Sequence, residues 1–292
     1  MKVLVIGGSG VIGSQIVKSF IRKKIDVEFT YLKNKPEFGM GNVLDITKRD
    51  NTIELITRMN PDVVIHTTAL ANVDLCETNN VLADQINVTG TRNITDACKI
   101  IKSKIVYVST PFVFDGTREQ YFEDDVVSPA TYYGITKYKG EEITRLSGLP
   151  YLILRTDQPY CWIEKWQHTN SVLRAIDTIK SNNILKEITD WYNVPTYVPD
   201  FVEAASKLLS SDAEGIFHVV GSEYINRYNW SLKVAEIFNL DKKMIKPIAS
   251  DTLGLPTRRV NVNLNNNKIR QSTGVHMSNI KEGLIKMIEE KE

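Results

Sequence analysis

Short apolar runs alternate along the chain with longer segments whose apolar residues recur at helical spacing. The runs are rich in β-branched residues, as buried parallel strands are. We expect strands at residues 3–6, 27–32, 62–66, 104–109 and 151–154. The segments between them carry an apolar face, which predicts helices at 14–24, 80–101 and 131–146. This alternation predicts an α/β fold with a Rossmann-type, doubly wound parallel sheet.

The second half of the chain has a less regular pattern. Residues 156–170 are aperiodic and aromatic, with Tyr160, Trp162 and Trp166. Helices are expected at 171–181, 199–210, 228–238 and 280–290, and strands that return to the sheet at 195–198 and 215–221. We predict a dinucleotide-binding domain at 1–155, its sheet completed by about 191–221, and a smaller C-terminal substrate lobe formed by 156–190 and 222–292.

A glycine-rich turn directly follows the first apolar run. Gly7, Gly10 and Gly13 form a G-x-x-G-x-x-G pattern at the junction of the strand and the helix. The first glycine permits a tight turn, the second lets the backbone approach a pyrophosphate, and the third lets the helix pack on the strand. Helix amides and the helix dipole then attract phosphates. The position of the turn favours a bound dinucleotide over a turn without a ligand.

The end of the second strand indicates which dinucleotide binds. NAD enzymes usually carry Asp or Glu there for the ribose 2′-hydroxyl. This chain has Tyr31, followed by Lys33 and Lys35, so no carboxylate repels a 2′-phosphate. We therefore expect NADP, with NAD as the alternative cofactor. Glu28 lies too early in the strand for this role, and the two lysines as solvated loop charges are the other interpretation.

Two residues of the predicted helix 131–146 are candidates for acid–base chemistry. Tyr133 and Lys137 are four residues apart and share one helix face. An ammonium group beside a phenol lowers the phenol pKa from about 10 and makes it a usable general acid. Thr110, at the end of strand 104–109, can bond the same substrate oxygen. Because the pair follows a Rossmann-type first half, we favour catalysis over the alternative of a surface i,i+4 pair.

Composition narrows the class of protein further. The net charge of the 292 residues is +1, so nothing indicates binding to nucleic acid or to an anionic membrane. No apolar run is long enough to span a bilayer. The three cysteines are widely spaced and the four histidines show no metal-ligand spacing, so we expect no metal, reduced thiols and a cytoplasmic location.

The chain resembles the dTDP-4-dehydrorhamnose reductase family, which belongs to the extended short-chain dehydrogenases/reductases, and also the regulatory β subunit of methionine adenosyltransferase. The resemblance covers nearly the whole chain. It rests on residues 7–13, 41–45, 60–66, 87–91, 107–110, 113–116, 132–134, Lys137, 154–156, 195–198 and 264–269.

This resemblance implies reduction of the 4-keto group of a nucleotide-linked deoxysugar by NADPH. It implies that Thr110, Tyr133 and Lys137 are the catalytic triad. It places Thr110, Phe112, Gln158 and Arg258 at the substrate. The implied cofactor residues are Gly7, Ser9, Gly10, Val11, Ile12, Gly13, Tyr31, Lys33, Asp45, Ile46, Thr68, Ala69, Leu70, Asn87, Tyr133 and Lys137.

Two departures from the family pattern leave the sugar open. Pro111 and Phe112 stand where the family has Asp and Tyr, and Gln158 stands where it often has Trp. The missing acid after Thr110 argues against a dehydratase. A nucleotide-sugar epimerase with bound NAD and a non-catalytic, NADP-binding regulatory subunit remain as alternatives. Helices 80–101 and 131–146 pair between subunits in many superfamily members, so we expect a homodimer.

Overall fold

The computed structural model describes residues 1–39 and 41–290. Within these residues, seven parallel strands form the central sheet, in the order β11-β6-β5-β4-β1-β2-β3. The strands are β1 (Lys2–Ile6), β2 (Asp26–Tyr31), β3 (Gly41–Val43), β4 (Val63–His66), β5 (Lys104–Ser109), β6 (Tyr151–Arg155) and β11 (Gly215–His218). The strand order reverses at β1, which pairs with both β2 and β4. The expected Rossmann-type fold is confirmed, and ligands of such folds bind at this reversal.

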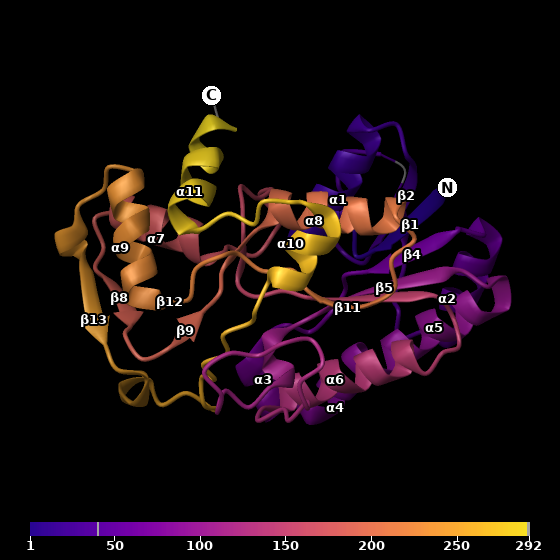
Figure 1. The fold of residues 1–292 in the computed structure, drawn as a ribbon, viewed down its shortest axis with the longest axis horizontal. Coiled ribbons are helices and arrows are strands. Elements are labelled where there is room, and N and C mark those ends of the chain that lie inside the picture. The colour runs from indigo at the N-terminus through magenta and orange to yellow at the C-terminus, as the bar shows by residue number, and fades with distance from the viewer. Residues whose placement is uncertain (40, 291–292) are drawn as a thin grey trace.

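Helices cover both faces of the sheet (Figure 1). On one face lie α1 (Val11–Arg22) and α8 (Val198–Ser210), which share a buried apolar core with the sheet. On the other face lie α2 (Arg49–Met59), α5 (Gly90–Ile101) and α6 (Tyr132–Arg145). The strands are therefore buried on both sides, which explains why their sequences are apolar throughout rather than alternating.

Two helices predicted in the N-terminal half of the chain differ from the observed ones. The first helix begins at Val11 instead of residue 14, because Gly10 already takes the extended N-cap conformation. The expected helix 80–101 is α4 (Asn80–Ala83), a π-helical turn (Asp84–Thr89) and α5. Single π turns occur often at functional sites. Here the turn carries Asn87, whose side chain is buried.

The predicted return of residues 195–198 to the main sheet is wrong. β10 (Thr196–Tyr197) pairs instead with β7 (Pro159–Tyr160) in a separate two-stranded sheet. The edge position beside β6 is occupied by β11. The strand expected from residue 215 is therefore in the main sheet as predicted, and the division into two domains stays a prediction.

The lobe packs around its own apolar core, at the left of Figure 1, with Trp230 fully buried in it. Its elements are α7 (Ser171–Lys180), β8 (Leu185–Ile188), β9 (Tyr192–Asn193), β12 (Ile225–Asn226), α9 (Arg227–Ile237), β13 (Ile245–Ile248) and α11 (Ile280–Glu289). Short helices α3 (Val73–Thr78) and α10 (Asn267–Thr273) complete the structure. The helices expected at 171–181, 228–238 and 280–290 are confirmed within about two residues.

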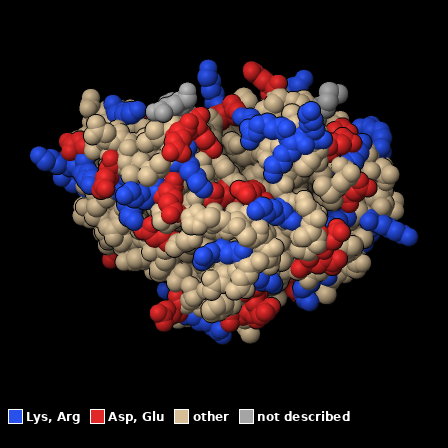
Figure 2. All heavy atoms as spheres, turned by 45° about the horizontal axis from the view of Figure 1, so that its top comes forward, with Lys and Arg blue, Asp and Glu red and all other residues tan. Residues whose placement is uncertain are grey.

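The surface carries both signs of charge. Acidic and basic side chains are interspersed over the face in Figure 2, in keeping with the net charge of +1. Among the described residues, no helix combines the length and apolarity needed to cross a membrane.

Candidate active site

The glycine-rich turn between β1 and α1 is tightly packed. Gly7 has φ +89°, a conformation that side chains disfavour, and a Cβ there would lie 2.4 Å from Thr68 Oγ1. A Cβ at Gly13 would lie 2.3 Å from the carbonyl oxygen of Gly7. The turn is held by hydrogen bonds from the Gly7 amide to Thr30 Oγ1 (3.2 Å) and from the Gly10 amide to the Gly7 oxygen (2.9 Å). Glycine is therefore required at positions 7 and 13 for steric reasons.

The N-terminus of α1 is suited to an anion. The first intrahelical bond runs from the Ser14 amide to the Gly10 oxygen at 2.9 Å, so the amides of Val11, Ile12 and Gly13 precede it. No side chain caps this end, and its first turn contains no acidic residue. These amides and the helix dipole can receive a pyrophosphate. The residues present thus fit a dinucleotide.

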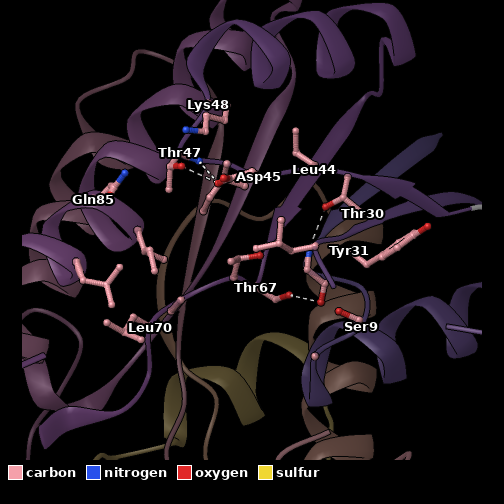
Figure 3. Close-up of a pocket in the computed structure, with 18 residues that line it drawn as sticks. Ser9, Thr30, Tyr31, Leu44, Asp45, Thr47, Lys48, Thr67, Leu70 and Gln85 are labelled. Carbon is pink, nitrogen blue, oxygen red and sulfur yellow. Dashed lines mark hydrogen bonds between the residues drawn. The ribbon is translucent and has the colours of Figure 1, made fainter. Parts of the chain in front are cut away.

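A cavity of about 550 Å³ opens beside this turn, at the carboxyl ends of β1, β2 and β4 (Figure 3). Nine of the predicted cofactor residues line it: Gly7, Ser9, Gly10, Tyr31, Asp45, Ile46, Thr68, Ala69 and Leu70. Five further polar residues line it that were not predicted from the sequence: Thr30, Thr47, Lys48, Thr67 and Gln85.

The cation at this cavity differs from the one expected. Lys33 and Lys35 are exposed in the loop after β2 and are not among the lining residues, whereas Lys48 is. Lys48 lies three residues after Asp45, and Asp45 Oδ1 accepts hydrogen bonds from the Thr47 amide and hydroxyl at 3.0 and 2.7 Å. This turn, visible in Figure 3, brings Lys48 to the cavity. In the sequence, Lys48 could have been noticed because it closely follows the motif at residues 41–45.

Asn87 supports the cavity wall. Its Oδ1 accepts from the Leu70 amide at 2.7 Å, and its Nδ2 donates to the Leu70 oxygen at 3.2 Å and to Thr136 Oγ1 at 3.0 Å. Asn87 thereby fixes the loop after β4 to helix α6. The cavity does not include Asn87, Val11, Ile12, Gly13, Tyr133 or Lys137 among its lining residues.

The predicted catalytic residues come from β5 and the start of α6. Thr110 directly follows β5, and Tyr133 lies in the first turn of α6, whose N-cap is Thr131. A Cβ on Gly134 would lie 2.0 Å from the Phe112 oxygen, so this glycine allows α6 to approach the end of β5 closely. Thr110, Tyr133 and Lys137 are all buried. The fold therefore brings the Tyr133 phenol to the Thr110 hydroxyl, and the Lys137 ammonium group bonds the Val108 oxygen near the end of β5.

The expected lowering of the Tyr133 pKa is wrong for this structure. Burial raises the pKa of Tyr133, and a hydrogen bond with Thr110 opposes that rise only in part. The ammonium group of Lys137 donates to the Val108 oxygen at 2.8 Å and lies 4.0 Å from the centre of the Tyr107 ring. Burial also lowers the pKa of Lys137 to about 7, although Glu141 opposes the change. Tyr133 is thus a protonated phenol, as a proton donor must be.

The predicted substrate residues lie in different surroundings. Phe112 packs edge-on against Tyr133, with ring centres 5.7 Å apart. Gln158 has φ +38°, and its Oε1 accepts from Arg227 Nη1 at 2.8 Å. Arg258 is exposed, whereas the neighbouring Arg259 is paired with Asp74. Arg258 is therefore the free member of the arginine pair within the described residues.

Asp157 is a buried acid that the sequence analysis did not select. It follows β6, and its Oδ2 accepts from the Val194 amide at 2.8 Å. Burial raises the pKa of Asp157 to about 6, against hydrogen bonds from Val194 and Asn193 and the charge of Arg227. Its charge also raises the pKa of Tyr133. In the sequence, Asp157 is marked only by its position directly after Arg155 and Thr156.

Trp162, Trp166 and Trp191 could each stack on a nucleobase, and all three have contacts within the protein. The ring centre of Trp191 lies 5.4 Å from the Arg227 guanidinium carbon and 5.5 Å from that of Arg259. Trp162 packs edge-on against Phe238, and the backbone oxygen of Trp166 accepts from Asn34 Nδ2 at 3.4 Å. The ring contacts of Trp162 and Trp191 favour a structural role for these two residues.

A Rossmann sheet, a glycine-rich turn at its reversal point and a Tyr-x-x-x-Lys pair in the helix after Thr110 agree with the resemblance to extended short-chain dehydrogenases/reductases. The family model for the RmlD substrate-binding domain matches residues 1–292, so the chain belongs to that family.

Individual proteins agree with this placement. A crystal structure of dTDP-4-dehydrorhamnose reductase from Bacillus anthracis in complex with NADP superposes with a TM-score of 0.89 at 26% identity, covering 99% of this chain and 100% of that one. Methionine adenosyltransferase 2 subunit beta of Rattus norvegicus is 28% identical, over 92% of this chain and 81% of the relative. The spore coat polysaccharide biosynthesis protein SpsK of Bacillus subtilis is 27% identical, over 99% and 98%. The chain is thus placed among the NAD(P)-dependent oxidoreductases of the dTDP-4-dehydrorhamnose reductase type.

Proposed function

We propose that the protein uses NADPH to reduce the 4-keto group of a nucleotide-linked deoxysugar. The observation that carries this proposal is the convergence of Thr110, Tyr133 and Lys137 at the end of β5, on the same sheet edge as the glycine-rich turn and its cavity. The related reductase from Bacillus anthracis binds NADP, which supports the choice of cofactor.

In this proposal the bound cofactor supplies a hydride to the ketone carbon, and the protein must stabilise and protonate the resulting oxyanion. Tyr133 donates the proton from its phenol, whose raised pKa keeps it protonated before the reaction. Thr110 donates a hydrogen bond to the same oxygen and already bonds Tyr133. Lys137 is held by the Val108 oxygen and the Tyr107 ring, and its pKa is lowered to about 7. In its protonated form it supplies positive charge near the end of β5 while Tyr133 loses its proton.

The direct test is NADPH consumption. The purified protein is mixed with NADPH and a panel of dTDP-, UDP- and GDP-linked 4-keto sugars, and the loss of NADPH absorbance is followed. We expect one nucleotide class to be reduced. The proposal is contradicted if the protein binds NADPH tightly but consumes no NADPH with any of these substrates.

A second candidate is a non-catalytic subunit that binds NADP and regulates a partner enzyme. The similarity to methionine adenosyltransferase 2 subunit beta favours it. The two functions are separated by adding the protein, with and without NADPH, to a methionine adenosyltransferase catalytic subunit. Complex formation and a changed rate of that enzyme, with no reduction of any keto sugar, would support regulation.

We further propose a homodimer and a cytoplasmic location. Val81 on α4 and Ile100 on α5 are 79% and 61% exposed, and they supply apolar surface on the outer helices. Cys76, Cys98 and Cys161 are buried free thiols, which suit a reducing compartment. Sedimentation at micromolar concentration should give the mass of two chains, and a monomer mass would contradict the dimer.

A further inference from the structure

The segment 161–170 of the lobe lies directly against the glycine-rich turn of the other domain. It joins β7 to α7 and has no regular secondary structure. We call this segment the strap. Its residue Gln167 contacts the turn, Glu164 contacts helix α1, and Trp166 contacts the loop after β2. It is thus a direct link between the lobe and two segments that border the cofactor cavity.

Gln167 uses its whole carboxamide group in this link. Its Nε2 donates to the backbone oxygen of Ser9 at 2.9 Å and to Ser14 Oγ at 2.9 Å. Its Oε1 accepts from the Glu164 amide at 3.0 Å, and the Gln167 amide donates to the Glu164 oxygen at 3.0 Å. Both side-chain hydrogens therefore bond the turn or the first turn of α1, while the strap's own backbone fixes the carboxamide.

An ion pair, and a hydrogen bond from Asn34 Nδ2 to the Trp166 oxygen at 3.4 Å, anchor the strap at two more points. The Glu164 carboxylate is paired with the ammonium group of Lys18, one helical turn after Ser14. Lys18 also lies 5.1 Å from the centre of the Phe38 ring in the loop after β2. These contacts join the strap to the same face of α1 that Gln167 contacts.

The hydrogen bonds of Gln167 do not use the backbone amides that are expected to bind phosphate. Gln167 takes the oxygen of Ser9 and the hydroxyl of Ser14, and it takes none of the amides of Val11, Ile12 or Gly13. The bonds therefore fix the backbone from outside without competing with an anion. A backbone held in its binding conformation before the ligand arrives binds more tightly, because less ordering remains to be done.

We propose that Gln167 is a positioning residue for the cofactor, by which the lobe holds the glycine-rich turn in the conformation that binds the pyrophosphate. This inference rests on the proposed use of NADPH. It gives the strap a role distinct from that of the cavity residues, because Gln167 acts through Ser9 and Ser14 rather than by touching the cofactor.

The test compares Gln167→Ala with Lys165→Ala, a matched control in the same strap. Lys165 is exposed and forms no hydrogen bond or ion pair to the described residues. NADPH binding is measured by fluorescence titration, and dissociation by stopped flow. We expect Gln167→Ala to weaken binding by about five- to tenfold, the effect of losing one or two hydrogen bonds, mainly through faster dissociation. Lys165→Ala should remain within about twofold of the wild type.

A second ligand separates positioning from general damage. Adenosine 2′-phosphate lacks the pyrophosphate, so its affinity should be nearly equal for wild type and Gln167→Ala. Hydrogen exchange at residues 9–13 should be faster in Gln167→Ala without any cofactor. Unchanged NADPH affinity, or an equal loss for both ligands, would overturn the inference. A wild-type protein that fails to bind NADPH would contradict the proposed function as well, whereas a wild type that binds and a variant that matches it contradict only the role of Gln167.

Discussion

The central sheet and the lobe are stabilised in different ways. In the sheet, strands such as β1 and β4 are buried on both faces, and apolar packing of α1, α8, α2 and α5 accounts for the arrangement. The lobe has two-residue strands and a buried charge cluster, in which Glu187 is paired with Arg174 and Arg227 and bonds Ser231. The sheet strands are the apolar runs that burial on both faces requires, whereas the lobe combines its own apolar core with particular polar contacts. The cavity is lined by residues between 7 and 86, and the lobe reaches its edge through Gln167, which bonds Ser9 and Ser14.

The largest expected effect is on catalysis by the residues at the end of β5 and the start of α6. Tyr133→Phe removes the proton donor but keeps the ring that packs on Phe112. Once a substrate is identified, turnover should fall by about 10²–10⁴-fold, the usual effect of losing an acid–base group. NADPH affinity should change little, because Tyr133 is not among the residues that line the cavity. Turnover at the wild-type rate would exclude Tyr133 as the donor.

A smaller effect is expected from the buried acid that follows β6. The pKa of Asp157 is raised from its usual 3.8 to about 6, so the folded protein holds this proton more tightly than the unfolded chain does. Its contribution to stability is therefore fully present below about pH 4 and is lost as the pH rises through about 6. Relative to Asp157→Asn, the wild type should lose up to about 3 kcal/mol over this range. The measurement is urea unfolding of both proteins between about pH 4 and about pH 7, and a pH-independent difference would contradict the prediction.

Two glycine substitutions separate the regions directly. In Gly13→Ala the new Cβ would lie 2.3 Å from the Gly7 oxygen, and in Gly283→Ala it would lie 2.0 Å from Tyr160 Oη in the lobe. Each should lower the free energy of unfolding by about 1–3 kcal/mol, as overpacking does. Only Gly13→Ala should also abolish NADPH binding, because only Gly13 belongs to the phosphate turn. Thermal unfolding and fluorescence titration check both expectations, and equal loss of NADPH binding in both variants would mean that the regions are not separable.

The sequence also predicts the central sheet better than it predicts the contacts of the lobe. Six of the seven sheet strands and the positions of Gly7, Gly10 and Gly13 could be predicted, because burial on both faces and tight turns impose local patterns. Strand β3 was missed, because its three residues are not buried. Helix α2 was missed, although its buried residues Leu55, Ile56 and Met59 have helical spacing. The triad could be predicted as a motif.

Other features depend on contacts that no local pattern records. The π turn at Asn87 follows from its bonds to Leu70 and Thr136, which lie far away in the sequence. The placement of β10 beside β7 depends on two-residue strands, which are too short to show a period. The raised pKa of Tyr133 depends on its burial, and the spacing to Lys137 says nothing about burial. The contact of Gln167 with the glycine-rich turn likewise joins segments 158 residues apart.

The smallest effect concerns the cofactor preference at the end of β2. Tyr31 lines the cavity, with no acidic residue to repel a 2′-phosphate at its position, and Lys48 lines the same cavity. Tyr31→Asp introduces a carboxylate there, which repels a 2′-phosphate and can accept a bond from a ribose hydroxyl. Two charges about 4 Å apart interact by several kcal/mol at an effective dielectric constant of about 20. Screening at an open cavity weakens this interaction, so we expect the ratio of NADPH affinity to NADH affinity to fall roughly tenfold.

Alanine variants of Lys48 and Lys33 show which of the two lysines affects the preference between NADPH and NADH. Lys48→Ala should weaken NADPH binding more than NADH binding, because removing a cation that lines the cavity takes away attraction for the more highly charged ligand. Lys33→Ala is the matched control, since Lys33 is exposed and outside the lining. Titrations with NADPH and NADH give the ratio for each protein. A preference for NADH in the unmodified protein would contradict the choice of cofactor, and a loss in Lys33→Ala equal to that in Lys48→Ala would restore the loop lysines as the 2′-phosphate contact.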